Sequence, residues 1–224
     1  MDDSQFESIL TGRRSVRGYL PDPIPADTMA SIFDMARAAP SNCNIQPWKV
    51  YVASGDARNE LATQLYGAAS MDEPPAPDFD MLHSYEGELR QRQVECAVAL
   101  YDNLGISRVD KVARKQAMLE NFRFFGAPHA AFITMPKGLT VFNGMDVGIY
   151  LQTLLLCMSR HGVASCAQGA LALYPNIVKS SLAIPSEEGL LVGISFGYED
   201  TEVPANKTIT SREPVTQLVK FIGH

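Results

Sequence analysis

Residues 146–160 constrain the fold more than any other stretch, because they predict a helix that is apolar on nearly all its sides. Such a helix has no face for water and is expected to be buried all round. In a chain of 224 residues, a helix of this kind often lies at a subunit interface. Its apolar stretch, residues 147–158, is too short to span a bilayer and contains Gln152 and Thr153. We therefore expect a core or interface helix, and no membrane segment.

The chain length and composition predict one globular domain. A chain of 224 residues can bury a full hydrophobic core. Its 46% hydrophobic and 20% charged residues are ordinary for such a domain. No internal repeat, low-complexity segment or linker divides it, so residues 1–224 are expected to form a single domain. Predicted helices and strands do not alternate regularly, which favours an α+β fold over a doubly wound α/β fold.

Charge and cysteine usage narrow the functional classes. The net charge of -6 and the pI near 5.2 argue against a nucleic-acid binder. None of the four cysteines forms a C-x-x-C pair, and no Cys/His spacing suggests zinc. A reduced, cytoplasmic protein fits this usage best. The first ten residues are acidic and lack an apolar core, so they do not predict a signal peptide.

Apolar periodicity gives a coarse map of the elements. It predicts helices over about residues 6–12, 29–38, 56–65, 79–104, 110–124 and 146–160, with a short closing helix over 214–222. It predicts strands over about residues 48–52, 130–135 and 190–198. Residues 71–77 contain three prolines and are expected to form a mobile loop or lid. Residues 163–169 are a candidate ligand loop, and residues 203–212 are expected to be extended.

The loop at residues 40–48 reads Pro-Ser-Asn-Cys-Asn-Ile-Gln-Pro-Trp. It lies between an amphipathic helical pattern and an alternating, strand-like run, so packed elements hold both its ends. Its Asn and Ser side chains offer short donors and acceptors where regular backbone pairing has ended. A loop of this kind can hold a flat, heteroatom-rich ligand. The alternative is a helix-to-strand turn whose side chains satisfy only their own backbone.

A basic cluster follows the first predicted helix and consists of Arg13, Arg14, Ser15 and Arg17. Guanidinium groups bind phosphate oxygens in a bidentate manner, and a nearby hydroxyl adds a donor, so the cluster is a candidate phosphate site. The alternative is a solvated basic turn after Gly12. Near the other end of the chain, Arg212 is a weaker candidate of the same kind. Its alternative is a surface ion pair with Glu213 or another acid.

Motifs for several other chemistries are absent from the sequence. There is no Walker motif and no G-x-G-x-x-G, so ordinary nucleotide folds are not indicated. The four histidines are scattered, and no serine stands in a G-x-S-x-G motif. Cys166 has no matched His and Asp or Asn in view, so a nucleophilic role is not favoured. An enzyme with this sequence would take its chemistry from a bound cofactor.

Taken in order, the motifs resemble those of the FMN-dependent nitroreductase family. They are Arg-Arg-Ser-Val-Arg after the first helix, Ala-Pro-Ser-Asn-x-Asn-x-Gln-Pro-Trp after the second, Gly-Tyr at 197–198 and Thr-Ser-Arg-Glu-Pro at 210–214. The resemblance spans about residues 6–219. Within it, Asn-Phe-Arg-Phe-Phe-Gly-Ala-Pro at 121–128 is most similar to the nitrobenzoate-reductase-like branch.

The resemblance implies an intertwined α+β homodimer with a central, mostly antiparallel sheet flanked by helices and with two FMN sites at the subunit interface. The residues that it places at the cofactor are Arg13, Arg14, Ser15, Arg17, Pro40, Ser41, Asn42, Asn44, Ala167, Gln168, Gly169 and Arg212. The arginines and Ser15 match positions that hold the phosphate and ribityl chain. Residues 40–44 match a segment that reaches the flavin of the partner subunit, and residues 167–169 match a loop whose backbone N–H groups contact the flavin. Gln46 would support the first loop, and Trp48 is interpreted as core packing.

The implied activity is ping-pong transfer of two electrons from NADPH or NADH, through FMN, to nitroaromatic or nitrobenzoate-like substrates, giving nitroso and hydroxylamine products. Phe122 and Arg123 are candidate substrate contacts, with core packing and an exposed helix arginine as their alternatives. Other implied activities are quinone or enone reduction, dehalogenation, flavin fragmentation, or flavin binding without catalysis. Two departures are Arg14, where some relatives carry His, and residues 71–85, which match no motif and leave the substrate open.

Overall fold

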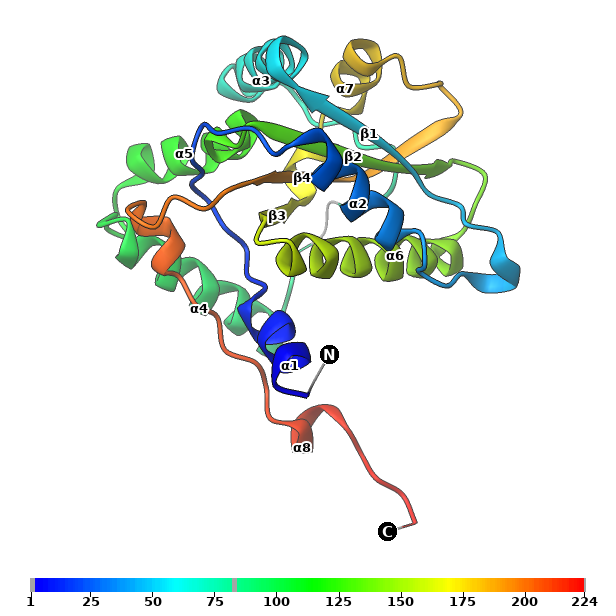
Figure 1. The fold of residues 1–224 in the computed structure, drawn as a ribbon. Helices are drawn as coiled ribbons and strands as arrows, with labels where there is room; N and C mark the ends of the chain where they lie inside the picture. The colour runs from blue at the N-terminus through cyan, green and yellow to red at the C-terminus, as the bar shows by residue number, and fades with distance from the viewer. Residues whose placement is uncertain (1–2, 82–83, 224) are drawn as a thin grey trace.

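The computed structural model describes residues 3–81 and 84–223 (Figure 1). Its elements are α1 (Asp3–Gly12), α2 (Ala26–Ala36), η1 (Asn42–Asn44), β1 (Lys49–Ser54), α3 (Gly55–Ser70), α4 (Gly87–Asn103), α5 (Lys111–Leu119), η2 (Glu120–Gly126), β2 (His129–Pro136), α6 (Val141–Arg160), β3 (Ala164–Gln168), η3 (Gly169–Ala172), α7 (Pro175–Leu182), β4 (Glu188–Gly197), η4 (Pro204–Lys207) and α8 (Val215–Leu218). The predicted α+β class is confirmed.

A four-stranded antiparallel sheet forms the centre, with the strand order β1-β2-β4-β3. Strand β2 is buried from residue 129 to residue 135 because helices cover both faces of the sheet. Phe132 joins the core cluster under α3, η2 and α7, and its neighbour Ile133 joins the cluster under α2 and α6. Figure 1 shows α3 and α7 on one side of the sheet and α6 on the other. Strand β3 is left at an edge.

Helix α6 begins earlier than predicted, because Thr140 and Asn143 form a capping box at its start. Burial all round is wrong for a single subunit. One face packs on the sheet, whereas the other exposes Val141, Phe142, Met145 and Ile149. The length and composition of α6 would allow it to cross a membrane. Buried core helices meet the same criterion, so this does not indicate a membrane segment. Its exposed apolar face is what contact with another subunit would cover.

The proline-rich segment after α3 is irregular, as predicted, but it is attached to the body. The N–H of Ala76 donates to the carbonyl of Leu173 (3.0 Å), and the hydroxyl of Tyr174 donates to the carbonyl of Glu73 (3.0 Å). Residues 71–77 are thus attached to the body at two points, and their mobility stays a prediction. Helix α4 begins at Gly87 and not near residue 79. Residues 82 and 83 of the unmatched 71–85 segment lie outside the described residues.

A buried carboxylate completes this attachment. Asp78 accepts from the N–H of Leu190 (2.9 Å) and from the ammonium groups of Lys137 (2.8 Å) and Lys179 (2.6 Å). The ring of the next residue, Phe79, packs directly on Gly189. A Cβ atom built on Gly189 would stand 2.4 Å from that ring. A side chain at position 189 would push the segment away. The segment is thus fixed against β4, and we call Asp78 with its two lysines the Asp78 cluster.

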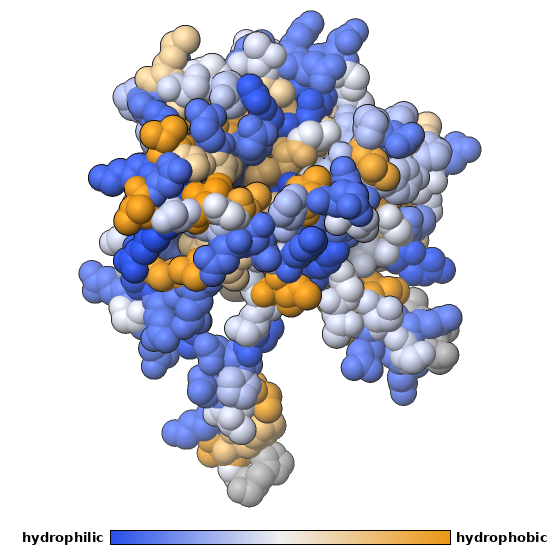
Figure 2. Space-filling model, turned by 90° about the vertical axis from the view of Figure 1, so that its left-hand side faces the viewer, coloured by the Kyte–Doolittle hydropathy of each residue, from blue (hydrophilic) through white to orange (hydrophobic). Residues whose placement is uncertain are grey.

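Two further elements differ from the sequence-based expectation. Residues 164–168 form strand β3 instead of a loop, because pairing with β4 orders a run of small residues. Helix α7 is an addition to the predicted elements. The closing helix is only Val215–Leu218, and the tail around it extends from the body with exposed Ile209, Val215, Leu218, Phe221 and Ile222. Figure 2 shows apolar atoms on this projecting tail.

His129 gives the fold a predicted pH dependence. Its Nε2 accepts from the N–H of Ile24 (2.9 Å), so the ring proton is on Nδ1, next to the hydroxyl of Ser54 (2.6 Å). Burial first, and then the charge of Arg58, lowers the pKa of His129. Because the folded-state pKa lies below the usual value of about 6.5, its stabilising contribution is complete above that pH and is lost as the pH falls.

We therefore expect the free energy of unfolding to fall below about pH 6.5, by at most about 1.4 kcal/mol per pH unit from this group. Urea unfolding of the wild type and of His129→Phe at several pH values gives the slope of the free energy of unfolding against pH for each protein. The variant is less stable at neutral pH, since the N–H of Ile24 loses its acceptor, but its slope is shallower. Equal slopes in the two proteins would contradict the assignment.

Candidate functional site

Residues 13–17 run along the open edge of β3 and bring several predicted residues together. Ser15 forms a parallel bridge with Ser165, and the N–H of Val16 donates to the carbonyl of Ser165 (3.0 Å). Arg13, Ser15 and Arg17 all lie close enough to Cys166 to lower the pKa of its thiol, against the larger effect of burial. The three predicted polar side chains therefore gather along one edge strand.

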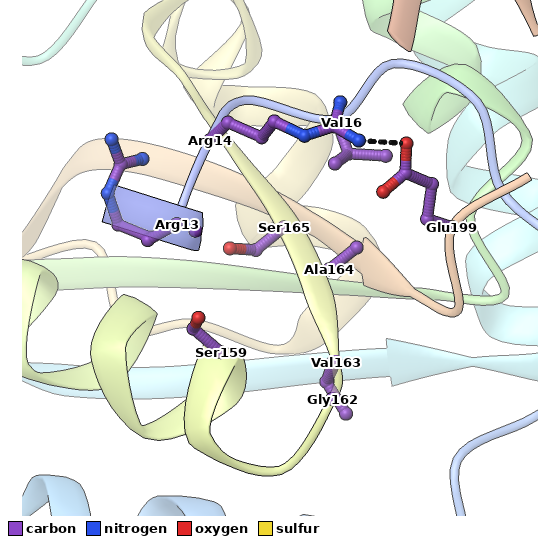
Figure 3. A pocket seen from close by; sticks show the side chains of 10 residues that line it. Arg13, Arg14, Val16, Ser159, Gly162, Val163, Ala164, Ser165 and Glu199 are labelled. Atoms are coloured by element: carbon purple, nitrogen blue, oxygen red, sulfur yellow. Dashed lines mark hydrogen bonds and ion pairs between the residues drawn. The ribbon is translucent and has the colours of Figure 1, made fainter. Parts of the chain in front are cut away.

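Arg14 points the other way. Its guanidinium donates to the carbonyl of Asn206 and pairs with Glu199 at 2.5 Å. Figure 3 shows the Arg13 and Arg14 side chains diverging, with Arg14 directed at Glu199. Residues 13, 15 and 17 share a side because alternate residues of an extended chain face the same way. Arg14 thus links the first segment of the chain to the segment after β4.

Arg13 reaches a small hollow between the end of α1, the end of α6 and the start of β3. Ser159, Gly162 and Ser165 also line this hollow. Within the part of the chain that the structure describes, the Arg13 guanidinium has no carboxylate partner. A half-buried cation without a counter-charge is suited to binding an anion.

Strand β3 presents backbone groups at its edge. Neighbouring residues of a strand direct these groups to opposite sides, so Ala167 directs its N–H and C=O outward like Ser165. The side chain of Gln168 is buried instead. Its amide donates to the carbonyl and side-chain oxygens of Asn121 (both 3.1 Å), and its oxygen accepts from the hydroxyl of Ser195. These bonds fix the β3 edge, where the outward groups of Ala167 lie beyond the Ser165 carbonyl that the N–H of Val16 occupies.

Asn121 and Met81 belong to this region but are absent from the site predicted by sequence. Asn121 lines, with Arg17, a cavity of about 760 Å³ whose other walls are mostly apolar residues of α4, α5 and η4. The sequence offers one indication of this role, because Asn121 is a polar residue directly before the Phe-rich stretch 122–125. The methyl group of Met81 lies 3.7 Å from where a Cβ on Gly169 would stand. No local pattern pointed to that contact, because it joins residues from two distant segments.

The polar loop lies far from this edge in the same subunit. Its Asn42 bonds to Asp146, near the start of α6, whereas β3 follows the end of α6. At 1.5 Å per residue, the 14 helical steps from residue 146 to residue 160 separate the two regions by roughly 20 Å. Figure 1 shows the loop at the opposite end of α6 from β3. Pro40, Ser41, Asn42 and Asn44 therefore do not complete the site of their own subunit.

Trp48 packs as expected, with its ring stacked on Tyr150 at a centroid distance of 4.7 Å. Gln46 supports the loop through its side-chain amide, which donates to the carbonyl of Asn44 (3.0 Å). Arg212 is exposed on the C-terminal segment, and its bonds to described residues go to Thr210 and Ser211. It lies beside α4, in a groove that also contains Arg92, and the structure does not place it in the Arg13 hollow.

The two candidate substrate contacts are not placed at this site. Phe122 is 1% exposed and packs against Tyr174 at 5.6 Å, so it belongs to the core and cannot stack on a substrate. Arg123 lies over the ring of Tyr66 at 3.9 Å and pairs with Glu120. Tyr66 belongs to α3, so Arg123 connects η2 to that helix. Phe122 therefore packs in the core, whereas Arg123 lies at the surface and its contact with a substrate stays a prediction.

The titratable groups near β3 do not form a hydrolytic site. Burial raises the pKa of the Cys166 thiol, although Arg17, Ser15 and Arg13 act in the opposite direction. A raised pKa opposes the thiolate that a nucleophile needs. Among residues 3–81 and 84–223, no group of three metal-ligating side chains is found. The chemistry available at this edge is binding, orientation and electrostatic stabilisation.

Comparison with known proteins identifies the family of this chain. Residues 10–198 match the model of the nitroreductase family. The chain belongs to the nitroreductase family. This nitroreductase is 38% identical to nitroreductase NfnB of Mycolicibacterium smegmatis, over 96% of this chain and 92% of the relative. It is 31% identical to 4-nitrobenzoate reductase of Pseudomonas putida, over 97% and 96%.

A solved structure has the same fold. The crystal structure of the FMN-dependent nitroreductase NfnB from Mycobacterium smegmatis in complex with NADPH superposes with a TM-score of 0.94 at 37% identity, covering 98% of each chain. The nitroreductase-like fold predicted from the motifs is thereby confirmed.

The residues present in this nitroreductase fit an FMN. The phosphate of FMN needs a cation, and Arg13 has no carboxylate partner among the described residues. The flavin ring needs outward backbone N–H groups, which the β3 edge provides around Ala167. It also needs an apolar slot with a few polar groups, which the cavity beside Arg17 and Asn121 supplies.

Proposed function

We propose that this chain is an FMN-dependent NAD(P)H nitroreductase that acts as a homodimer. The observation that carries the proposal is the placement of Arg13, Ser15 and Arg17 in succession along the edge of β3, where Ser15 bridges Ser165. When bound there, FMN would take a hydride from NADPH or NADH and pass two electrons to an acceptor, in a ping-pong sequence. The names of the relatives support this chemistry and the cofactor.

Each residue of the chain has a defined role in this proposal. Arg13 holds the phosphate, Ser15 the ribityl chain and Arg17 the far end of the flavin. The outward N–H of Ala167 contacts the ring edge, and the buried bonds of Gln168 keep that edge rigid. Positive charge and fixed N–H dipoles at this edge would stabilise negative charge that develops on the bound cofactor. Arg14, held by Glu199, has a structural role.

A homodimer brings the missing parts to the site. Residues 40–44 lie at the wrong end of α6 for their own subunit, so they would serve the site of the partner. The exposed face of α6 and the apolar tail, which includes Phe221, offer the surface that such a dimer needs. Arg212 would reach the phosphate once the tail is seated. Light scattering measures the oligomeric state of the FMN-bound protein. A monomer that retains FMN would contradict a site shared between two subunits.

The acceptor is proposed to be a nitroaromatic compound. A nitro group takes two electrons and two protons and loses water to give a nitroso group, and two more of each give the hydroxylamine. The apolar cavity beside Arg17 suits one or two aromatic rings. The nitrobenzoate reductase among the relatives supports an aromatic carboxylate, whereas quinone or enone reduction on the same site is the alternative activity.

The test is reduction of the bound flavin. We expect the purified protein to be yellow and to bleach when NADPH or NADH is added under argon. The reduced protein is then mixed in turn with 4-nitrobenzoate, nitrobenzene, a quinone and an enone, and the return of absorbance is timed. Faster reoxidation by the nitro compounds supports the proposal. A flavin that stays oxidised with both donors excludes the reductase activity.

A further inference from the structure

We infer that Asp146 is a positioning residue, which fixes residues 40–46 in the conformation needed to contact FMN bound in the partner subunit. Asp146 lies in α6, is 5% exposed, and accepts from the N–H of Asn42 at 2.8 Å through Oδ1. Its Oδ2 is buried and has no hydrogen-bond partner in the described residues. The inference rests on the proposed function.

The loop that Asp146 holds is strained. Cys43, Asn44 and Gln46 have φ angles of 49°, 56° and 45°, in the left-handed region that side chains other than glycine rarely adopt. Strain of this kind persists only where surrounding contacts determine the conformation, and it concentrates at binding sites. The backbone is therefore being held in a shape that the local sequence does not prefer.

Hydrogen bonds inside the loop do not connect it to the protein. The N–H groups of Asn44 and Gln46 bond to the carbonyl and hydroxyl of Ser41 (3.0 and 2.9 Å), and the N–H of Ile45 bonds to the carbonyl of Asn42 (3.2 Å). Among residues 40–46, as far as the structure describes their partners, only the Asn42–Asp146 bond reaches another element. Among the described residues, this carboxyl group thus provides the hydrogen bond that ties the loop to α6.

The same face of α6 holds the other end of the loop. Tyr150 lies one turn after Asp146 and stacks on Trp48 at 4.7 Å. The loop is therefore mounted at two points on α6, next to the exposed apolar face of this helix, which includes Phe142, four residues before Asp146. A subunit that seats α6 against a partner would carry residues 42–44 with it, which links dimer formation to the geometry of the flavin site.

The carboxyl group is unfavourable for folding alone. A buried oxygen without a partner costs stability, and an apolar side chain of similar size in its place is often neutral or stabilising. Asp146→Leu removes both the unpaired oxygen and the acceptor for Asn42. Asp146→Asn keeps an oxygen that can accept from Asn42. The pair of variants separates a positioning role from a purely structural one.

The measurements are amide hydrogen exchange of residues 42–46 in the FMN-free protein, the melting temperature, and FMN affinity by fluorescence titration. For Asp146→Leu we expect a melting temperature equal to or above that of the wild type, faster exchange at Asn42, and FMN binding weaker by about ten-fold or more. Asp146→Asn is expected to restore most of the protection and affinity. Val147→Ala, a buried neighbour in α6, should melt lower without changing either.

Different outcomes overturn different claims. If the wild type binds FMN and Asp146→Leu binds it equally well, the positioning role is excluded and the proposed function stands. If the exchange at Asn42 is unchanged, the anchor itself is excluded. A wild type without affinity for FMN would overturn the proposed function and this inference together. If Asp146→Leu does not fold, Asp146→Asn serves as the test, because it keeps an oxygen that can accept from the N–H of Asn42. Loss of FMN affinity in Asp146→Asn at an unchanged melting temperature would then exclude the proposed role of this hydrogen bond.

Discussion

Replacing Arg13 with Ala is expected to weaken FMN binding by about ten-fold to a hundred-fold, since a charge-assisted hydrogen bond contributes about 1.5–3 kcal/mol. Arg13 has no carboxylate partner among the described residues, so its removal costs the fold little. The measurement is titration of the FMN-free protein, followed by quenching of flavin fluorescence. The melting temperature without FMN should change little.

Two matched arginines control for this result. Arg37→Ala removes an exposed arginine paired with Asp34 and should leave FMN affinity unchanged. Arg14→Ala should instead lower stability, because Glu199 loses the partner that joins it to the first segment of the chain. Wild-type affinity in Arg13→Ala would remove Arg13 from the phosphate site. Equal losses in Arg13→Ala and Arg37→Ala would point to an unspecific charge effect.

Replacing Asp78 with Ala is expected to lower the free energy of unfolding by about 3 kcal/mol or more, because a buried charge is left without its partner. The side chains of Asp78 and Lys179 are 7% and 9% exposed. Burial alone would raise the pKa of Asp78, but the N–H of Leu190 and the two ammonium groups outweigh it and lower this pKa. Denaturant unfolding at neutral pH measures the loss.

The effect of Asp78 should depend on pH and on burial. A lowered carboxyl pKa means that the stabilisation is complete above the usual value of about 3.9 and is lost in stronger acid. The matched control is Asp34→Ala, which breaks an exposed ion pair and should cost at most about 1 kcal/mol. Release of the segment should also speed exchange at the N–H of Leu190. Similar small losses in both variants would show that the Asp78 cluster does not fix the segment.

Local patterns predict the elements that local forces decide. Apolar periodicity locates α2, the buried strand β2 and the end of α6 at Arg160. The order and spacing of the motifs predict the family and its fold, and both are confirmed. The failures share a cause. Strand β3 consists of small residues whose conformation is set by pairing with β4, a contact across about thirty residues of chain.

The site divides along the same line. The sequence alone shows that Arg13, Ser15 and Arg17 are spaced two residues apart. In an extended backbone, side chains with this spacing point to the same side. Tertiary packing alone engages Arg14 with Glu199, 185 positions away, and buries Phe122. Packing also sets Asp146, an acid inside an apolar helix, against the polar loop. Such pairings join distant segments, so no local periodicity encodes them, and the folding of the whole chain fixes which polar groups are left for a ligand.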